Sequence, residues 1–168
     1  GDVYKRQTRS RPPQLGCLGL HEWAMVYGLD QEEIRHAGRP LRLPPGEIRR
    51  FVDGRHLCCT HYDAYRFFTP GAAPLNQHRP TLDDRVQNEQ PGCIHTNMDL
   101  YKWAFKLRHW VPGELLGDCF LLARDAREID MRASPYDLED LGYSPIRIET
   151  SDGREEYRAA QAALAHRS

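Results

Sequence analysis

The chain has 168 residues, of which 40% are hydrophobic and 28% are charged, and its formal net charge is −1. This length suits one domain with its own core, and the composition excludes a disordered chain. The near-neutral charge excludes a general attraction to nucleic acid or to a membrane surface, and no apolar run approaches the roughly 20 residues of a membrane span.

The first seven residues read GDVYKRQ. Residues 2–7 match the peptide that a transposase adapter for sequencing libraries encodes when it is translated. We therefore expect residues 1–7 to be foreign, and residues 8–168 to form a single domain that lacks part of its natural N-terminus. The five cysteines are an odd number without a Cys-x-x-Cys pair, which favours reduced thiols and a cytoplasmic location.

The pattern of apolar residues and turn signals predicts an α+β fold, predominantly helical, with a β-hairpin and a short C-terminal strand. A long polar stretch over residues 69–92 divides the elements into two sets. The expected elements, in chain order, are a buried helix over residues 14–28, a short helix over 29–38, a hairpin turning at Asp53-Gly54, helices over Met98–His109 and from Glu114 to about Asp130, an extended stretch over 143–150, a turn at Asp152-Gly153 and a terminal helix from Glu155.

The segment EQPGCIHTNMDLYKWAF, residues 89–105, places four chemically active side chains at the start of a predicted helix. Asn97 is a good N-cap, and Asp99 in the first turn would complement the helix dipole. These structural roles are sufficient for Asn97 and Asp99, but they explain neither Cys93 nor His95. His95 and Asp99 are therefore candidate catalytic residues.

Cys93 and His95 also suggest a metal site. Cys17 and His21 lie four residues apart on the first predicted helix, so their side chains share one face. The two pairs together would supply the four ligands of a tetrahedral zinc site, although Cys-x-His is an unusual zinc spacing. The alternative is that the cysteines are reduced core residues. We expect no cofactor, with zinc at Cys17, His21, Cys93 and His95 as the alternative.

Two further polar pairs are candidates for chemistry. On a strand, His61 and Asp63 would point to the same face, where a carboxylate beside an imidazole can orient a general base. The alternative is a hydrogen-bonded pair at a sheet edge. His21 and Glu22 interrupt an otherwise apolar helix, so we expect them to face a cavity or another polar cluster.

A third region, residues 130–143, brings Asp130, Arg132, Tyr136 and Asp137 to the end of a predicted helix. Such a loop can form the rim of a site, or it can be a turn held by its own hydrogen bonds. The candidate catalytic residues are Asp99, His95, His61 and Asp63. The candidate substrate-binding residues are His21, Glu22, Asn97, Tyr101, Lys102, Arg132 and Tyr136.

The chain contains no phosphate-binding glycine loop, no dinucleotide fingerprint and no zinc-protease or zinc-deaminase motif. Its sequence resembles a family of mostly actinobacterial proteins labelled 3-methyladenine DNA glycosylase, over about Pro12 to Ala165. The resemblance rests on the stretches PPQLGCLGLHEWAMVYG, EIRHAGRPLRL, CTHYDAYRFFTPGAAPLN, EQPGCIHTNMDLYKWAFKL and DMRASPYDLEDLGYSPIRIET. The helix-hairpin-helix motif that many DNA glycosylases use is absent.

The resemblance implies excision of an alkylated purine from DNA, with the base extruded into a pocket. A carboxylate, Asp99 or Asp63, would stabilise the sugar cation and activate water, and His61 or His95 would orient it. The basic segment from Arg35 to Arg66 would follow the phosphates of a DNA partner. The candidate stacking residues are Trp23, Tyr65, Tyr101 and Trp103.

Two other functions remain open from the residues themselves. One is a small-molecule or metal-dependent hydrolase that uses the cluster of His61, Asp63, His95 and Asp99. The other is a non-enzymatic binding or scaffold protein, in which the polar clusters only satisfy buried hydrogen bonds. We expect no membrane partner.

Overall fold

The computed structural model describes residues 10–168 of the chain, so the expectation about residues 1–7 lies outside the described part. Over this part the protein is helical and contains no β-strand, only two isolated bridges. The elements are α2 (Leu20–Ala24), α3 (Pro45–Asp53), α4 (Tyr62–Tyr65), the 3-10 helix η1 (Ala73–Leu75), α5 (Arg85–Asn88), α6 (Ile94–Lys106), α7 (Gly113–Ala133), the 3-10 helix η2 (Glu139–Leu141) and α8 (Ser151–Arg167).

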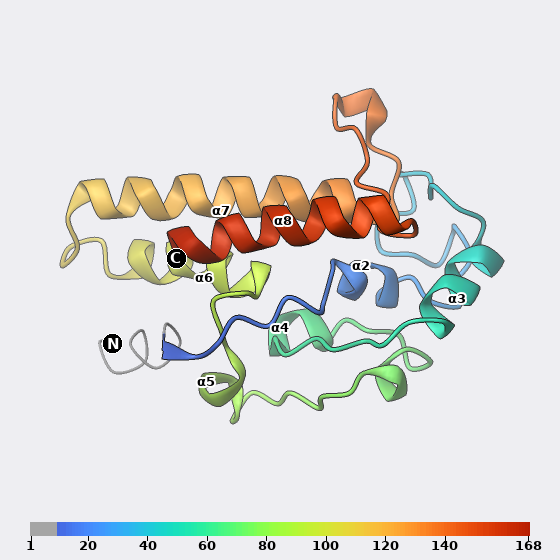
Figure 1. Cartoon of the computed structure of the whole chain (residues 1–168), viewed down its shortest axis with the longest axis horizontal. Coiled ribbons are helices and arrows are strands. Elements are labelled where there is room, and N and C mark those ends of the chain that lie inside the picture. The colour runs from blue at the N-terminus through green and yellow to red at the C-terminus, as the bar shows by residue number, and fades with distance from the viewer. Residues whose placement is uncertain (1–9) are drawn as a thin grey trace.

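The three long helices form one layer, and the short helices lie on one side of it. Helix α6 runs antiparallel to α7, and α8 returns along α7 in the opposite direction (Figure 1). Helices α2 to α5 and their connections lie on this side, from α5 below the middle of α7 to α3 beyond its C-terminal end (Figure 1). The core between the two parts contains Trp23, Ile48, Val52 and Tyr157, all of which are buried.

The predicted β-hairpin at Asp53-Gly54 is wrong, because this segment is the helix α3. Pro45 stands in the first turn of α3, where the missing N–H costs nothing and the fixed φ favours a helix. Ile48 and Val52 lie four residues apart and are both buried, which is a helical spacing. Gly54 is the C-cap of α3, so the same Asp-Gly pair that signals a hairpin turn here ends a helix.

The predicted C-terminal strand is also wrong, although the alternation on which it rests is present. Ile146 and Ile148 are both buried, as expected for one face of an extended segment. The segment pairs with no strand, because the N–H of Ile146 donates to the carbonyl of Arg132 at the end of α7. The fold class is therefore all helical over the described residues, and not α+β.

Several helices begin or end at other residues than predicted, because left-handed residues interrupt one segment and a predicted capping residue lies inside a helix. The helix expected over residues 14–28 is limited to α2, because Leu18 and Gly19 take positive φ angles of 49° and 73°. The helix expected over 29–38 is a series of turns. Helix α6 begins at Ile94, so Asn97 lies inside it and not at its N-cap. The helix from Glu114 to Asp130 is confirmed as α7.

The start of α8 depends on a glycine that contacts another segment. Asp152-Gly153 lies in the first turn of α8 and forms no turn between elements. A Cβ at Gly153 would overlap the backbone of Arg147, which is a rigid neighbour. The side chain of Thr150 accepts a hydrogen bond from the N–H of Gly153 and caps the helix at this point.

Replacing Gly153 by alanine is expected to lower the free energy of unfolding by about 2 kcal/mol, because the new methyl group forces α8 away from Arg147. Gly117→Ala in α7 is the matched control, since nothing lies within 4 Å of its added Cβ. That variant should gain about 0.5–1 kcal/mol from helix propensity. Urea denaturation of both variants measures the difference, and equal stabilisation by both would contradict the close packing.

Candidate functional site

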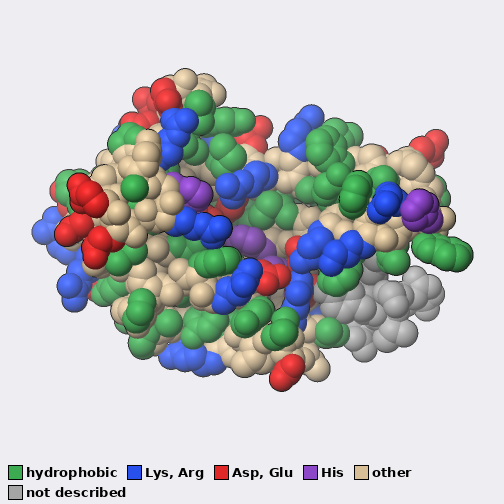
Figure 2. Space-filling view, turned by 180° about the vertical axis from the view of Figure 1, so that it is seen from behind, with side chains coloured by type: hydrophobic (Ala, Val, Ile, Leu, Met, Phe, Trp, Pro, Cys, Tyr) green, Lys and Arg blue, Asp and Glu red, His purple; other side chains and the backbone are tan. Residues whose placement is uncertain are grey.

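Three histidines from distant parts of the chain form a row inside the protein. The ring of His95 lies in the middle, with its centroid 4.6 Å from that of His21 and 5.2 Å from that of His61. The His21 ring meets His95 edge-on, whereas the His61 ring is stacked on it. Figure 2 shows histidine side chains at the bottom of a hollow, with Lys and Arg around it.

Local backbone features place each of the three histidines. The left-handed residues Leu18 and Gly19 turn the chain immediately before α2, so His21 falls in the first turn of that helix. His95 is the second residue of α6, because α6 starts earlier than predicted. His61 is the N-cap residue of α4, in extended conformation, and its ring is turned inward.

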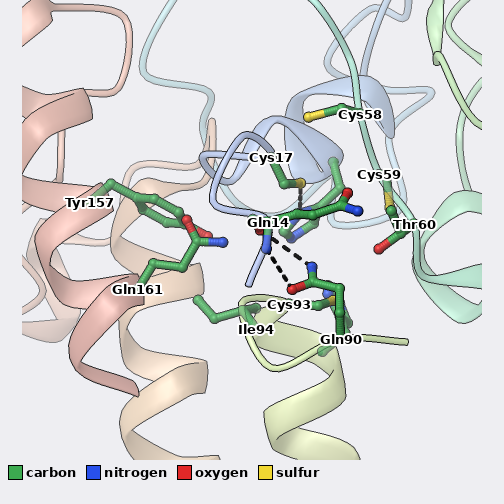
Figure 3. A pocket seen from close by; sticks show the side chains of 12 residues that line it. Gln14, Cys17, Cys58, Cys59, Thr60, Gln90, Cys93, Ile94, Tyr157 and Gln161 are labelled. Atoms are coloured by element: carbon green, nitrogen blue, oxygen red, sulfur yellow. Dashed lines mark hydrogen bonds between the residues drawn. The ribbon is translucent and has the colours of Figure 1, made fainter. Parts of the chain in front are cut away.

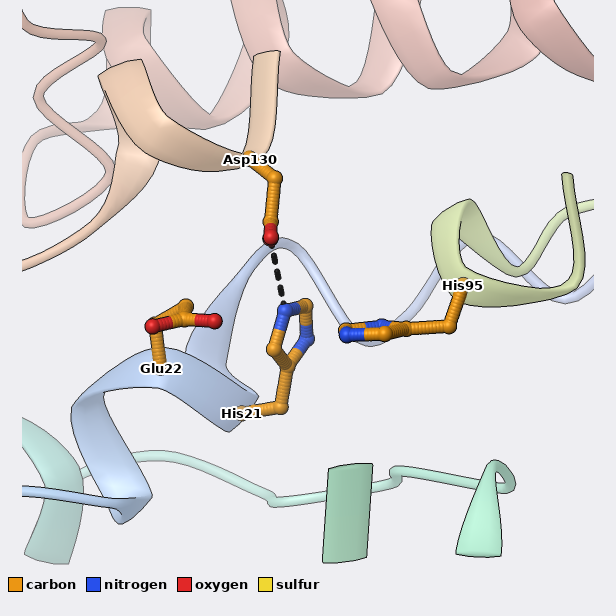
Figure 4. Close-up of side chains that lie close together, drawn as sticks. All are labelled: His21, Glu22, His95 and Asp130. Carbon is orange, nitrogen blue, oxygen red and sulfur yellow. Dashed lines mark hydrogen bonds and ion pairs between the residues drawn. The ribbon is translucent and has the colours of Figure 1, made fainter. Parts of the chain in front are cut away.

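The first group of polar side chains surrounds His21. We call His21, Glu22, His95 and Asp130 the His21 group; each offers one ligand atom, and these atoms all lie within 4.8 Å of one another. Nε2 of His21 contacts Oδ1 of Asp130 at 2.7 Å, and the ring of His95 points at His21 from the other side (Figure 4). The second oxygen of Asp130 accepts a hydrogen bond from Arg127 at 3.0 Å.

The second group lies at the other end of the row. We call His61, Asp63 and Asp99 the His61 group; its ligand atoms also lie within 4.8 Å of one another. Nε2 of His61 is 3.4 Å from Oδ2 of Asp99, but neither ring nitrogen of His61 has a hydrogen-bond partner among the described residues. Arg85 and Lys102 each contact Asp99 at 2.7 Å.

Burial and neighbouring charges change the acidity of the His21 group strongly. Burial, followed by the positive charge of His21, lowers the pKa of His95 to about 3, so its imidazole is neutral at pH 7. Burial opposes the charging of His21, but the carboxylate of Asp130 prevails and raises the pKa of His21 well above its usual value. Burial and the nearby Asp130 carboxylate raise the pKa of Glu22 to about 7.

The carboxylates that face a histidine stay ionised. Burial alone would raise the pKa of Asp130, but the charge of His21 outweighs it and lowers this pKa to about 2. Burial would likewise raise the pKa of Asp99, but its contacts with His61 and Lys102 outweigh burial and lower this pKa to about 2. Each end of the row therefore carries a fixed negative charge.

Both groups reach the same cleft, which we call the central cleft. Its volume is about 590 Å³, within the range of small-molecule sites. Glu22 and His95 of the His21 group and Asp63 of the His61 group line it. The other lining residues are Met25, Leu29, Glu33, Arg35, His36, Ala64, Arg66, Phe67, Thr69, Arg127 and Tyr136.

The cysteines of the predicted zinc site lie behind the row. Cys17 and Cys93 line a pocket of about 10 Å³ that also touches His21 and His95, with room for about one water (Figure 3). Sγ of Cys17 is 3.2 Å from Nδ1 of His21. The two histidines, however, share their group with carboxylates and not with thiols. The four-ligand zinc site stays a prediction.

Of the candidate residues, the structure brings together six. His21, Glu22, His61, Asp63, His95 and Asp99 belong to the two groups.

Lys102 joins the same site through its ion pair with Asp99, and Tyr136 lines the central cleft. Three others lie elsewhere. Asn97 donates to the carbonyl of Pro91, Tyr101 packs edge-on against Phe120, and Arg132 binds Ser144 and Glu156.

Asp130 is the member of the His21 group whose role the sequence shows least clearly. The sequence places it in a loop rim, but it is fully buried inside α7, between the buried Ala126 and Ala133 at helical spacing. A carboxylate on the buried stripe of a helix is the signal that identifies it, because buried charges need a partner. Arg127 lies three residues before Asp130 on the same helix, so helical spacing could have identified it, whereas the contacts of Arg85 with Asp63 and Asp99 join separate elements.

Most of the basic segment from Arg35 to Arg66 is already paired. Arg39 binds Asp140, and Arg42 binds Glu149. Trp23, one of the predicted stacking residues, is fully buried and donates to the carbonyl of Ala133. Arg49 and Arg50, in contrast, are largely exposed and make only loose contacts of 3.9 Å with acidic neighbours.

Comparison of the chain with protein-family models, with curated protein sequences and with solved structures finds no match. The resemblance to proteins labelled 3-methyladenine DNA glycosylase therefore stays a prediction. None of the helices in the described part of the chain is long and apolar enough to cross a membrane.

Replacing Asp130 by asparagine is expected to lower the free energy of unfolding of the metal-free protein by about 3 kcal/mol, because it removes one partner of a buried ion pair. Asp125→Asn on the same helix is the matched control. Asp125 forms half-exposed ion pairs with Arg124 and Arg167, whose loss should cost less than about 1 kcal/mol. Equal losses in the free energy of unfolding of the two variants, measured by urea denaturation, would contradict a large contribution of the His21–Asp130 pair to stability.

The same variant should reveal a pH window. A raised His21 pKa stabilises the fold below the unfolded pKa of about 6.5, and that contribution disappears as the pH rises through the folded value. A lowered Asp130 pKa stabilises the fold above about pH 3.9 and is lost as the pH falls towards 2. The stability difference between wild type and Asp130→Asn should therefore be largest between about pH 4 and 6.5. A difference that grows steadily above pH 8 would contradict this assignment.

Proposed function

We propose that the protein is a divalent-metal-dependent hydrolase that acts on a small molecule in the central cleft. The observation that carries this proposal is the His21 group, in which two imidazoles and two carboxylates from α2, α6 and α7 offer ligand atoms within 4.8 Å of one another. Nitrogen and carboxylate ligands in this combination suit Zn²⁺, Fe²⁺ and Mn²⁺.

The surroundings of the group also fit a metal centre. His95 is neutral at pH 7, as a ligand must be. Arg127 holds the second oxygen of Asp130, and the contact of Cys17 with Nδ1 fixes the plane of the His21 ring. Such outer contacts orient ligands in known metal sites. The face formed by Glu22 and His95 opens on the central cleft, which leaves access for water and substrate.

The chain's own residues would support hydrolysis in the following way. A bound ion lowers the pKa of its water towards 7 and supplies a nucleophile at neutral pH. Asp63 lines the same cleft and would accept a proton from such a water. Arg127, on the cleft wall, can hold an oxygen that becomes negative during the reaction.

A small substrate fits better than a DNA base. The central cleft has room for a small molecule, whereas Arg39 and Arg42 of the basic segment are held by acidic partners. The alternative hydrolase cluster of His61, Asp63, His95 and Asp99 is included in this proposal, since His95 joins the two groups.

The function is tested with protein stripped by a chelator and reloaded with Zn²⁺ or Mn²⁺. We expect hydrolysis of at least one member of a panel of nitrophenyl carboxylate and phosphate esters, lost on stripping and restored on reloading. Methylated duplex DNA is assayed in parallel for release of 3-methyladenine. Release of the base without added metal, or a metal-loaded protein inactive on the whole panel, would contradict the proposal.

His95→Ala should reduce metal affinity and the metal-dependent rate by roughly 100-fold or more, since even an outer-shell partner is worth roughly 10–100-fold. His109→Ala is the control, because His109 is exposed and lies beyond the end of α6. Metal content by mass spectrometry and the rate on the best ester are measured for both variants. An unchanged metal content in His95→Ala would contradict the assigned ligand.

Metal affinity should rise with pH between about 6 and 8, because an ion must displace the proton that Asp130 stabilises on His21. Calorimetric titration in buffers of different ionisation enthalpy measures the proton released with each ion. Affinity that falls as the pH rises over this range would contradict the involvement of His21.

A further inference from the structure

We propose that the His61 group is a second divalent-cation site, so that the row of histidines holds a pair of ions. This inference rests on the proposed function, because the first ion at the His21 group makes the second one relevant to catalysis. Two metal ions that share a cleft are a common arrangement in enzymes that hydrolyse esters and phosphates.

His61 is the observation that points to a ligand. Its side chain is 2% exposed, and both Nδ1 and Nε2 lack a hydrogen-bond partner among the described residues. A buried imidazole without partners costs free energy that a folded protein normally avoids. Nε2 faces Oδ2 of Asp99 at 3.4 Å in a loose ion pair without hydrogen-bond geometry, and this spacing is compatible with two ligands of one ion.

The two carboxylates already attract positive charge. The ammonium of Lys102 lies 2.7 Å from Asp99 and 3.7 Å from Asp63. Arg85 lies 2.7 Å from Asp99 and 3.3 Å from Asp63. Two side-chain cations thus converge on the same pair of carboxylates.

Both cations are hydrogen-bond donors and both contact the carboxylates, so the only printed polar contact of the His61 ring is its 3.4 Å ion pair with Asp99. A divalent ion would satisfy all three side chains together. It would compete with Lys102, whose flexible side chain is about one-third exposed and can swing into solvent. Arg85 is fixed more firmly, since it also binds Glu89 at 2.8 Å.

The composition of the group indicates the class of ion. One imidazole and two carboxylates favour Mn²⁺, Fe²⁺ or Zn²⁺ and disfavour copper(I), which prefers sulfur ligands. The stacking of His61 on His95 places this site beside the first one, and Asp63 faces the central cleft. A substrate in the cleft would therefore meet both ions.

The test is a titration of the stripped full chain with Mn²⁺, followed by calorimetry and by metal analysis after desalting. We expect two ions in the wild type and one in Asp99→Asn. Glu22→Gln, which alters the His21 group, should also retain one ion. Circular dichroism and thermal unfolding confirm that each variant is folded.

Lys102→Gln distinguishes a metal site from an ion-pair network. Loss of the competing ammonium should tighten the binding of Mn²⁺ at the His61 group by about tenfold, the effect of one ion pair of ordinary strength. Lys106→Gln is the matched control, because Lys106 lies one turn further along α6, over the ring of Trp103. An affinity for Mn²⁺ that is the same in Lys102→Gln, Lys106→Gln and wild type would overturn the second site.

The outcomes separate the two proposals. A wild type that binds no Mn²⁺ overturns both. One ion that is lost in Glu22→Gln and retained in Asp99→Asn overturns the second site and leaves the proposed function intact. Two ions in the wild type and one in Asp99→Asn support the second site.

Discussion

The contact between His21 and Asp130 is the interaction on which the rest of the structure depends. It joins residues 109 positions apart in the chain, and it ties the short helix α2 to the long helix α7 at 2.7 Å. A buried carboxylate that is fully removed from water requires a cation, so this contact fixes both helices and the plane of the imidazole. The ring of His95 then packs against His21, and the ring of His61 stacks on His95.

Burying a row of three imidazoles with carboxylates at each end costs free energy of folding, because charged groups lose their hydration. Replacing a buried ion pair by apolar side chains is often neutral or stabilising, so stability alone does not explain such a cluster. The proposed metal centre would give the facing charges and the shared cleft a common purpose, with His95 kept neutral by burial and by the charge of His21. It also explains the unpartnered nitrogens of His61, which a purely structural network leaves unsatisfied.

The sequence predicts the individual polar residues better than the fold that unites them. The long helix α7 is predicted correctly, and His21-Glu22 stands out because it interrupts an apolar segment. His61 and Asp63 stand out as an imidazole and a carboxylate two residues apart, although the strand expected there is the helix α4. Their convergence depends on contacts between segments that no local pattern encodes. Asp53-Gly54 misleads because the same dipeptide ends a helix or turns a hairpin, and proline at the start of α3 decides between them. The early start of α6 moves Asn97 from a cap into the core.

The most direct test of the metal centre is a crystal of the protein grown with Mn²⁺ and measured for anomalous scattering at the manganese absorption edge. We expect an anomalous peak between His21, Glu22, His95 and Asp130. Crystals grown at a saturating concentration of Mn²⁺ that show no peak at the His21 group, and that retain the direct contact of His21 with Asp130, would contradict the proposed metal centre.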